Sequence, residues 1–348
     1  TKHLYDPAEW TDKGNLGALI WQPLSGLLSG INTIYYAPAG LLYQVNLDAV
    51  PVSDVEIMAD RFRMHRLVST RQLVEKKITP DAFSPDNALV FGGIRYDADS
   101  SSFSPGTRHG NISTEKKSDT HPAPGRSAAF GEDWPFLNGS LKEVKGVRAR
   151  LESSGVKVYF ADGLDASESS FKNAVTKAPP ALLHLATHGF FIAAPDSTAF
   201  SGFESSADPM ARAGLVLAGA NRVWSGLDLP DTLQDGILTA LEISHLNLKK
   251  TQLAVLSACG TGQGKVEAGE GILGLQRAFK MAGVHYIILN LWNVQDHQAQ
   301  EFVDMFYEEW LMQHNSIPDA FRQAQKRMRS HYSKPFQPMA WAGFMLLE

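Results

Sequence analysis

Short apolar segments alternate with longer amphipathic segments along most of the 348 residues of this chain. A run of roughly four to eight apolar residues predicts a buried strand, whereas apolar positions three or four residues apart predict a helix. The predicted strands are residues 88–93, 156–160, 182–187, 284–291 and 339–347, together with the apolar run that opens residues 253–262. The predicted helices are residues 141–153, 167–175, 236–245, 271–283, 298–314 and 318–329. This alternation predicts an α/β sandwich with a mainly parallel central sheet of about six strands.

The first 80 residues have a different pattern and predict a smaller N-terminal α+β subdomain. Residues 1–15 are polar and predict an exposed lead-in, and residues 16–30 predict a helix broken at Pro23. Residues 31–50 predict a β-hairpin with its turn at 37–40, where proline and glycine interrupt the apolar pattern. We expect the boundary to the larger unit, residues 81–348, near Thr79-Pro80.

Polar segments interrupt the larger unit. Residues 97–127 are rich in Ser, Gly, Pro, Asp and Lys, so they cannot bury enough apolar surface to offset the entropy of ordering. We therefore expect a mobile surface insertion there. The polar loops 193–211 and 260–271 each follow a predicted strand, and we expect them to border a site at the carboxyl edge of the sheet.

Two local patterns carry predictions of their own. Ser140 and Glu143 have the spacing of a capping box at the start of helix 141–153. His184 and His188 lie four residues apart, as in some metal sites, but they lack the helical HExxH context. We therefore interpret His184 as a structural neighbour and expect no metal.

The strongest candidate chemistry lies at the ends of two apolar strands. Residues 182–189 read LLHLATHG and lead into His188, whereas residues 253–262 read LAVLSACGTG and lead into Cys259. If these strands are parallel neighbours, both residues emerge at the same edge of the sheet. A thiol has an ordinary pKa of about 8.5, and a histidine is well matched to deprotonate it near neutral pH. Gly189 and Gly260 leave the backbone N–H groups beside them accessible to a developing oxyanion.

Simpler interpretations exist for each of these residues taken alone. A single cysteine is usually a small buried hydrophobe, and a single histidine is usually structural. The glycines of residues 260–271 could suggest a phosphate-binding loop, but Gly264-Lys265 is followed by Val266 instead of Ser or Thr. A flexible loop beside the site fits this segment better than a nucleotide site does.

Composition and charge exclude several other classes of protein. The formal net charge is −5 and the isoelectric point is near 6, so we expect no direct nucleic-acid binding by a broad basic face. A single cysteine excludes an internal disulfide and is consistent with a reducing, cytoplasmic location. The chain contains no apolar run of about 18 residues, so we expect no membrane span. Because it begins at Thr1, we expect a piece of a longer protein.

The joint pattern of strand, His-Gly, strand and Ala-Cys-x-x-Gly resembles the caspase-like cysteine peptidases. Further segments resemble the CHAT domain, a bacterial branch of that grouping often fused to tetratricopeptide repeats. These segments are HLATHG, LVLAGAN, DGILTALEISHLNL, LAVLSACGTGQG, GEGILGLQRAFKMAGV and LWNVQD. The resemblance covers most of residues 18–348 and implies a caspase-like three-layer sandwich.

The resemblance also implies a mechanism. Cys259 would attack a peptide carbonyl, His188 would act as general base or acid, and the main-chain N–H groups of Gly189 and Cys259 would stabilise the oxyanion. Caspase-like enzymes use a dyad and no cofactor. Relatives that cut after Arg or Lys hold that side chain with a carboxylate. The candidates here are Asp296, placed in a loop after strand 284–291, and then Asp228, Asp231 and Asp235.

The expected partners are a protein substrate and an upstream tetratricopeptide-repeat domain or regulatory partner that gates the site. Family members occur in bacterial defence or signalling, with guide-RNA complexes or pore-forming proteins as associates. Caspase-like peptidases sometimes cut their own linkers, so residues 97–127 could be a processing linker instead of a plain insertion. The alternative function is a catalytically silent CHAT scaffold for protein–protein contact.

Overall fold

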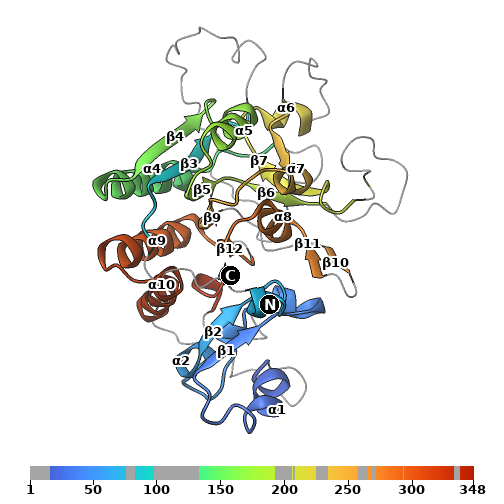
Figure 1. The fold of residues 1–348 in the computed structure, drawn as a ribbon, viewed down its shortest axis with the longest axis vertical. Coiled ribbons are helices and arrows are strands. Elements are labelled where there is room, and N and C mark those ends of the chain that lie inside the picture. Colours follow the sequence, from blue (N-terminus) through green and yellow to red (C-terminus); the bar gives the residue numbers. More distant parts are fainter. Residues whose placement is uncertain are drawn as a thin grey trace.

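The computed structural model describes residues 16–75, 83–97, 133–192, 206, 208–224, 234–257, 265–267, 271–292, 294–332 and 338–348. Its centre is a six-stranded sheet in the order β13-β12-β9-β5-β3-β4 (Figure 1). The strands are β3 (Asn87–Ile94), β4 (Lys157–Gly163), β5 (Leu182–Ala186), β9 (Leu253–Ser257), β12 (Tyr286–Asn290) and β13 (Phe344–Leu347). All neighbours are parallel except β12 and β13, which are antiparallel. The predicted α/β sandwich with a mainly parallel sheet is confirmed.

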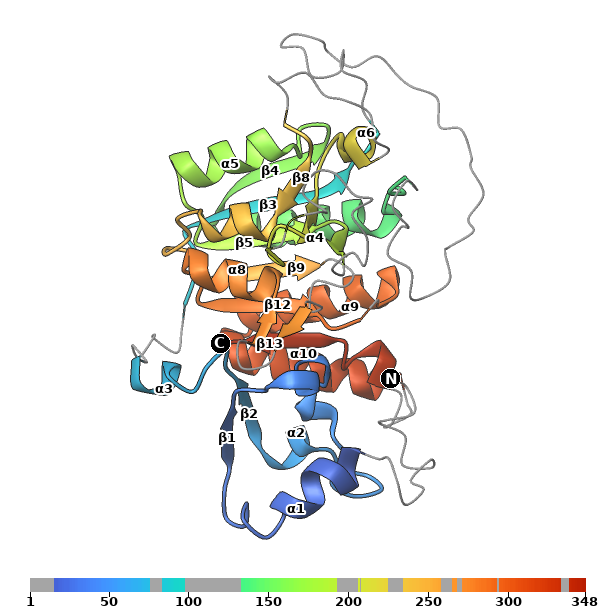
Figure 2. The ribbon, with the colours of Figure 1, turned by 90° about the vertical axis from the view of Figure 1, so that its right-hand side faces the viewer.

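Helices cover both faces of this sheet (Figures 1 and 2). One face carries α4 (Asn138–Ser153), α9 (Asp296–Tyr307) and α10 (Ile317–His331), and the other carries α5 (Glu168–Lys177), α7 (Ala240–Ser244) and α8 (Leu275–Ala282). Every residue of β5 is buried, as expected for a strand covered on both sides. Gly92 allows α4 to pack closely, because a Cβ atom there would lie 2.5 Å from a methyl carbon of Val144. On the opposite face, Phe171 of α5 packs edge-on against Phe91 of β3.

A second, antiparallel sheet begins where the chain leaves β5 of the central sheet. It has the order β6-β7-β8, with β6 (Gly189–Phe191), β7 (Ala213–Val216) and β8 (Ile237–Thr239). The helix α6 (Ala220–Trp224) follows β7, and a two-stranded sheet pairs β10 (Lys265–Glu267) with β11 (Gly271–Leu273). The predicted helices 236–245 and 271–283 therefore begin with short strands, because β8 and β11 find partners in β7 and β10.

The predicted hairpin over residues 31–50 is wrong. Strand β1 (Thr33–Tyr36) pairs in parallel with the unpredicted β2 (Arg63–Arg66), so its partner is not the next segment of the chain. Two 3₁₀ turns follow β1, at Gly40–Gln44 and Leu47–Ala49. The side chain of Asn46 caps the second turn by accepting a hydrogen bond from the N–H of Asp48 at 3.0 Å. This local capping competes with strand formation.

The rest of the N-terminal region is made of short elements. A π-helical turn at Gly17–Trp21 leads into α1 (Gln22–Leu24), and Pro23 lies in the first turn of α1, where proline is tolerated, so it does not break the helix there. The remaining helices are α2 (Met58–Arg61) and α3 (Gln72–Glu75). Within the described residues, no helix has the length and hydropathy that crossing a bilayer requires.

The predicted capping box on α4 is also wrong. The helix begins at Asn138, three residues earlier than the expected start at residue 141. The hydroxyl of Ser140 donates to the carbonyl of Leu137 at 2.9 Å and accepts from the N–H of Gly93 at 3.0 Å. Glu143 is buried and faces the sheet, because its carboxylate has tertiary partners there.

Candidate active site

His188 lies at the junction between β5 and β6, at the carboxyl edge of the central sheet. Its Nε2 atom is 2.8 Å from the carbonyl oxygen of Pro135. A carbonyl oxygen can only accept, so Nε2 carries the proton and donates this hydrogen bond. In the neutral ring, Nδ1 is then the atom with the free lone pair. The contact thus selects the tautomer in which Nδ1 can take a proton.

Two aromatic rings enclose the His188 imidazole. The ring of Tyr96 lies 5.1 Å away between centroids, and the ring of Trp134 lies 5.0 Å away. Burial lowers the pKa of His188, against the hydrogen bond to Pro135 and the negative charge of Asp296, which raise it. A ring held neutral in this way is a competent general base near neutral pH.

Hydrogen bonds fix the backbone beside His188. The hydroxyl of Thr187 donates to the carbonyl of Val216 and accepts from the phenol of Tyr96 at 3.0 Å. The N–H of Val216 donates to the carbonyl of His188 at 2.9 Å. Antiparallel ladders alternate, so a bond at His188 directs the N–H of Gly189 away from β7, toward the open edge of β6. That is the orientation an oxyanion-binding N–H needs.

The cysteine motif follows the neighbouring strand. Strands β5 and β9 are adjacent and parallel, with Ala186 paired to Ser257, and the N–H of Thr187 donates to the carbonyl of Ser257 at 3.2 Å. His188 and Cys259 each follow two residues after this pair. The prediction that both motifs lie on neighbouring parallel strands is confirmed. Cys259 itself lies outside the described residues.

Beneath this edge lies a small cavity of about 30 Å³, which has room for about two water-sized groups. Its lining comes from α4, from the residues that follow β5 and β12, and from β9 and α9. The lining residues are Leu137, Gly139, Ser140, Glu143, Thr187, Ser257, Asn290, Val294, Asp296 and Ala299. Two carboxylates, those of Glu143 and Asp296, therefore share one small cavity with Thr187, which precedes His188, and Ser257, which ends β9.

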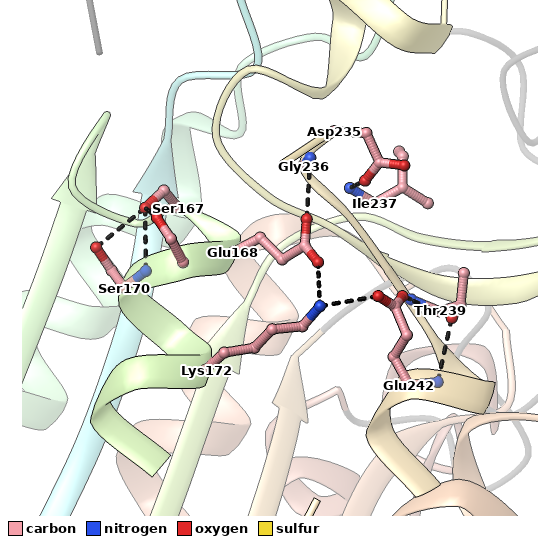
Figure 3. Close-up of polar contacts among 10 residues, drawn as sticks. Ser167, Glu168, Ser170, Lys172, Asp235, Gly236, Ile237, Thr239 and Glu242 are labelled. Atoms are coloured by element: carbon pink, nitrogen blue, oxygen red, sulfur yellow. Dashed lines mark hydrogen bonds and ion pairs between the residues drawn. The ribbon is translucent and has the colours of Figure 1, made fainter. Parts of the chain in front are cut away.

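Of the four predicted substrate-binding carboxylates, the structure describes two, and it separates them. Asp296 lines the cavity, but it is the first residue of α9 and not part of a loop as predicted. Asp235 lies elsewhere, close to Glu168, Lys172 and Glu242 (Figure 3). Its carboxylate accepts a hydrogen bond from the N–H of Ile237 at 2.8 Å. Asp228 and Asp231 lie outside the described residues.

A buried hydrogen-bond network that sequence reasoning missed supports the cavity. The carboxylate of Glu143 accepts from His184 Nε2 at 2.9 Å and from the hydroxyl of Ser257 at 3.0 Å. The phenol of Tyr307 lies 3.1 Å from His184 Nδ1, and because burial raises the pKa of Tyr307 it stays protonated and donates. The interpretation of His184 as a structural neighbour fits these contacts. The available signal was Glu143 itself, which shares a helix face with Val147 and Leu151 at i, i+4 spacing.

The described residues contain no group of three or more His, Cys, Asp or Glu side chains that could hold a metal ion. Among the described residues, the imidazole of His188 has Nδ1 as the nitrogen with the free lone pair, and the N–H of Gly189 points away from β7.

A mainly parallel sheet whose neighbouring strands lead into a histidine and a cysteine defines the caspase-like class of α/β folds. Residues 13–347 match the CHAT domain, so the chain belongs to the CHAT domain family. The chain also resembles tetratricopeptide repeat protein 28 of Homo sapiens, with 35% identity over 116 residues, which are 33% of this chain and 4% of that protein. The Mus musculus protein of the same name is 35% identical over 129 residues, 37% of this chain and 5% of that protein. The matched regions thus span a small fraction of these relatives.

Solved structures confirm the fold class. The Arg-specific cysteine proteinase gingipain R superposes with a TM-score of 0.51 at 10% identity, covering 95% of this chain and 66% of gingipain. Saccharomyces cerevisiae separase, from its complex with securin, superposes with a TM-score of 0.50 at 10% identity, covering 90% of this chain and 15% of separase. At these identities the likeness concerns the fold alone.

Proposed function

We propose that this chain is a cysteine endopeptidase in which His188 and Cys259 form the catalytic dyad. The observation that supports it most is the pairing of Ala186 with Ser257 on neighbouring parallel strands, two residues before His188 and Cys259. Chain connectivity keeps each of these two residues within about 7.6 Å, Cα to Cα, of its strand end. The proposal therefore puts both reactive side chains at one edge of one sheet.

The proposed mechanism begins with proton transfer from the Cys259 thiol to Nδ1 of His188. The thiolate attacks the peptide carbonyl, and the N–H groups of Gly189 and Cys259 stabilise the oxyanion. The imidazolium then donates its proton to the leaving amine, and the acyl-enzyme forms. Water, deprotonated by His188, attacks the acyl group and releases Cys259. The Nε2 bond to Pro135 keeps the imidazole oriented through both steps.

The cavity lined by Thr187 and Ser257 supports a preference for a basic residue before the cut. Asp296 also lines it, and a carboxylate pairs well with a lysine ammonium or an arginine guanidinium, whereas the carboxylate of Glu143 is already bonded to His184 and Ser257. Its volume of about 30 Å³ is too small for all the atoms of a lysine or arginine side chain, so substrate binding has to widen it. This requirement favours a gated enzyme whose assembled site becomes populated on binding an upstream repeat domain or partner protein.

Alkylation provides a direct test of the dyad, because Cys259 is the only cysteine in the chain. Iodoacetamide reacts with the thiolate, so wild-type protein should be labelled near pH 7 several-fold faster than His188→Ala, in which the thiol keeps its ordinary pKa. Cys259→Ala is the blank. Equal labelling rates in the wild type and in His188→Ala would contradict the dyad.

The second candidate is a catalytically silent scaffold for protein–protein contact. What favours it is that the relatives named above are called tetratricopeptide repeat proteins, a name that describes repeats and no peptidase activity. A thiol-reactive peptide probe separates the two functions. Labelling of Cys259 that requires His188 supports the peptidase, whereas absence of labelling in the presence of the activating partner supports the scaffold.

A further inference from the structure

Asn221 joins the two segments that enclose His188, and it has no role in the mechanism described above. It lies in α6, at the end of the segment LVLAGAN, and is 4% exposed. Its Oδ1 atom accepts from the N–H of Trp134 at 2.7 Å, and its Nδ2 donates to the carbonyl of Trp134 at 3.1 Å. Nδ2 also donates to the carboxylate of Asp97 at 2.6 Å. One amide side chain thus satisfies both backbone groups of Trp134.

These bonds determine the direction of the neighbouring carbonyl. With its N–H and C=O both bound, Trp134 has little rotational freedom, and a residue before proline is already confined to extended conformations. The ring of Pro135 fixes its own φ near −65°. Only ψ of Pro135 is left to orient the carbonyl that accepts from His188 Nε2. The same bonds fix the backbone from which the indole of Trp134 projects, and that indole packs against the imidazole.

The other wall of the imidazole is tied to the same helix. The backbone N–H of Asn221 donates to the carbonyl of Tyr96 at 3.1 Å, and the N–H of Gly219 donates to the carbonyl of Arg95 at 3.1 Å. Tyr96 packs against His188 and donates to Thr187. Gly219 has a φ of +84°, which allows the chain to turn from β7 into α6 at this point.

We propose that Asn221 is the positioning residue of the histidine: it holds the Pro135 carbonyl and both aromatic walls where they fix the tautomer and orientation of His188. This inference rests on the proposed function, because it concerns the same dyad. It also gives a physical reason for an asparagine in the LVLAGAN segment. Aspartate has no N–H to donate to the Trp134 carbonyl and would place a second carboxylate against Asp97.

The test measures the rate of Cys259 alkylation by iodoacetamide between pH 5 and 9 in Asn221→Ala and Asn221→Asp, beside wild type and His188→Ala. Asn46→Ala is the matched control. Asn46 is 2% exposed, accepts from the N–H of Asp48 and donates to the carbonyls of Ala342 and Phe344. Asn46→Ala therefore removes the same kinds of hydrogen bond as Asn221→Ala, but away from His188. Thermal unfolding of each variant measures the general loss of stability.

We expect both Asn221 variants to lose labelling rate near pH 7 by several-fold, toward the rate of His188→Ala, with the rise in rate displaced toward the ordinary pKa of a thiol. Asn46→Ala should keep the wild-type rate and pH profile despite a similar loss of thermal stability. A wild-type profile in Asn221→Asp, or an equal loss in Asn46→Ala, overturns the positioning role. If His188→Ala itself labels like wild type, the dyad fails first, so the two failures are distinguishable.

Discussion

His188 and Pro135 are joined by a hydrogen bond of 2.8 Å from Nε2 to the carbonyl oxygen, although they lie 53 residues apart in the chain. In a catalytic triad, the carboxylate orients the histidine ring and leaves the opposite nitrogen to act as base. The bond to Pro135 orients the His188 ring in the same way and leaves Nδ1 free. A carbonyl carries no full charge, so it stabilises the imidazolium less than a carboxylate would. Burial therefore dominates, and the pKa of His188 is lowered.

The first prediction concerns pH. If proteolysis requires neutral His188, the acid limb of the pH profile of kcat/KM reports the pKa of this residue. Because burial lowers that pKa from its ordinary value of about 6.5, the limb should lie below pH 6.5. The negative charge of Asp296 raises the pKa of His188, so Asp296→Asn should move the limb to still lower pH. Asp235→Asn, at the separate cluster of Figure 3, should leave the limb where it is. A limb that moves to higher pH in Asp296→Asn would contradict this assignment.

The second prediction is that Cys259→Ala and His188→Ala each abolish proteolysis and leave the fold intact. Without the thiolate the covalent route is lost, and without the base most of the thiol stays protonated near neutral pH. The losses should not add, because residues that act as one unit give a double variant scarcely worse than either single one. Cleavage of a protein substrate in the presence of the activating partner is the measurement, and clear residual cleavage by Cys259→Ala would refute the mechanism.

The third prediction concerns specificity. Profiling with a peptide library should show a preference for Lys or Arg before the cut, and Asp296→Ala should weaken it by more than about tenfold, since an ion pair in a confined site is lost. Asp235→Ala serves as the control, because its carboxylate is used on the N–H of Ile237. The proposal for Asp296 is defeated if the preference is unchanged in Asp296→Ala.

The fourth prediction concerns the ion pairs of Figure 3, in which only Glu168 is buried. Lys172 bridges Glu168 at an i, i+4 position and the partly exposed Glu242 at 2.8 Å, and Glu168 is 3% exposed. Lys172→Met leaves both carboxylates without this cation and should cost about 2 kcal/mol of unfolding free energy, between the values for buried and exposed pairs. The control is Arg148→Met, which loses an exposed i, i+4 pair with Glu152 and a cation–π contact with Phe160 and should cost about 1 kcal/mol or less.

The cost of Lys172→Met should also depend on pH. Burial raises the pKa of Glu168 to about 7, against the opposing effect of Lys172. The folded state therefore binds this proton more tightly than the unfolded state, and its contribution to stability falls as pH rises from about 4.5 to about 7. Lys172 stabilises the ionised form, so its removal should cost more at pH 8 than at pH 5. Denaturant titrations at both pH values test this, and an equal or smaller cost at pH 8 would contradict it.

The sequence alone predicted the central sheet and the placement of the two reactive motifs. Strands such as β5 and β9 are short and apolar except for His184 and Ser257, so their burial is visible in composition without any knowledge of their partners. Strands β5 and β9 are parallel neighbours, so their carboxyl ends lie at the same edge of the sheet. His188 and the cysteine motif follow these two ends. Such strands can be recognised from their own residues, because burial on both faces requires apolar side chains whichever strands lie beside them.

Only the tertiary structure decided features that depend on distant partners. Glu143 matched a local capping box, but His184 and Ser257, 41 and 114 residues away, satisfy its carboxylate inside the core. Residues 31–50 matched a hairpin, but β1 found its partner in β2. Asn221 gave no signal as a single polar residue, because its role depends on the backbone of Trp134, 87 residues earlier. A buried polar group must find a partner, and the chain positions that supply it are fixed by the packing of the whole fold.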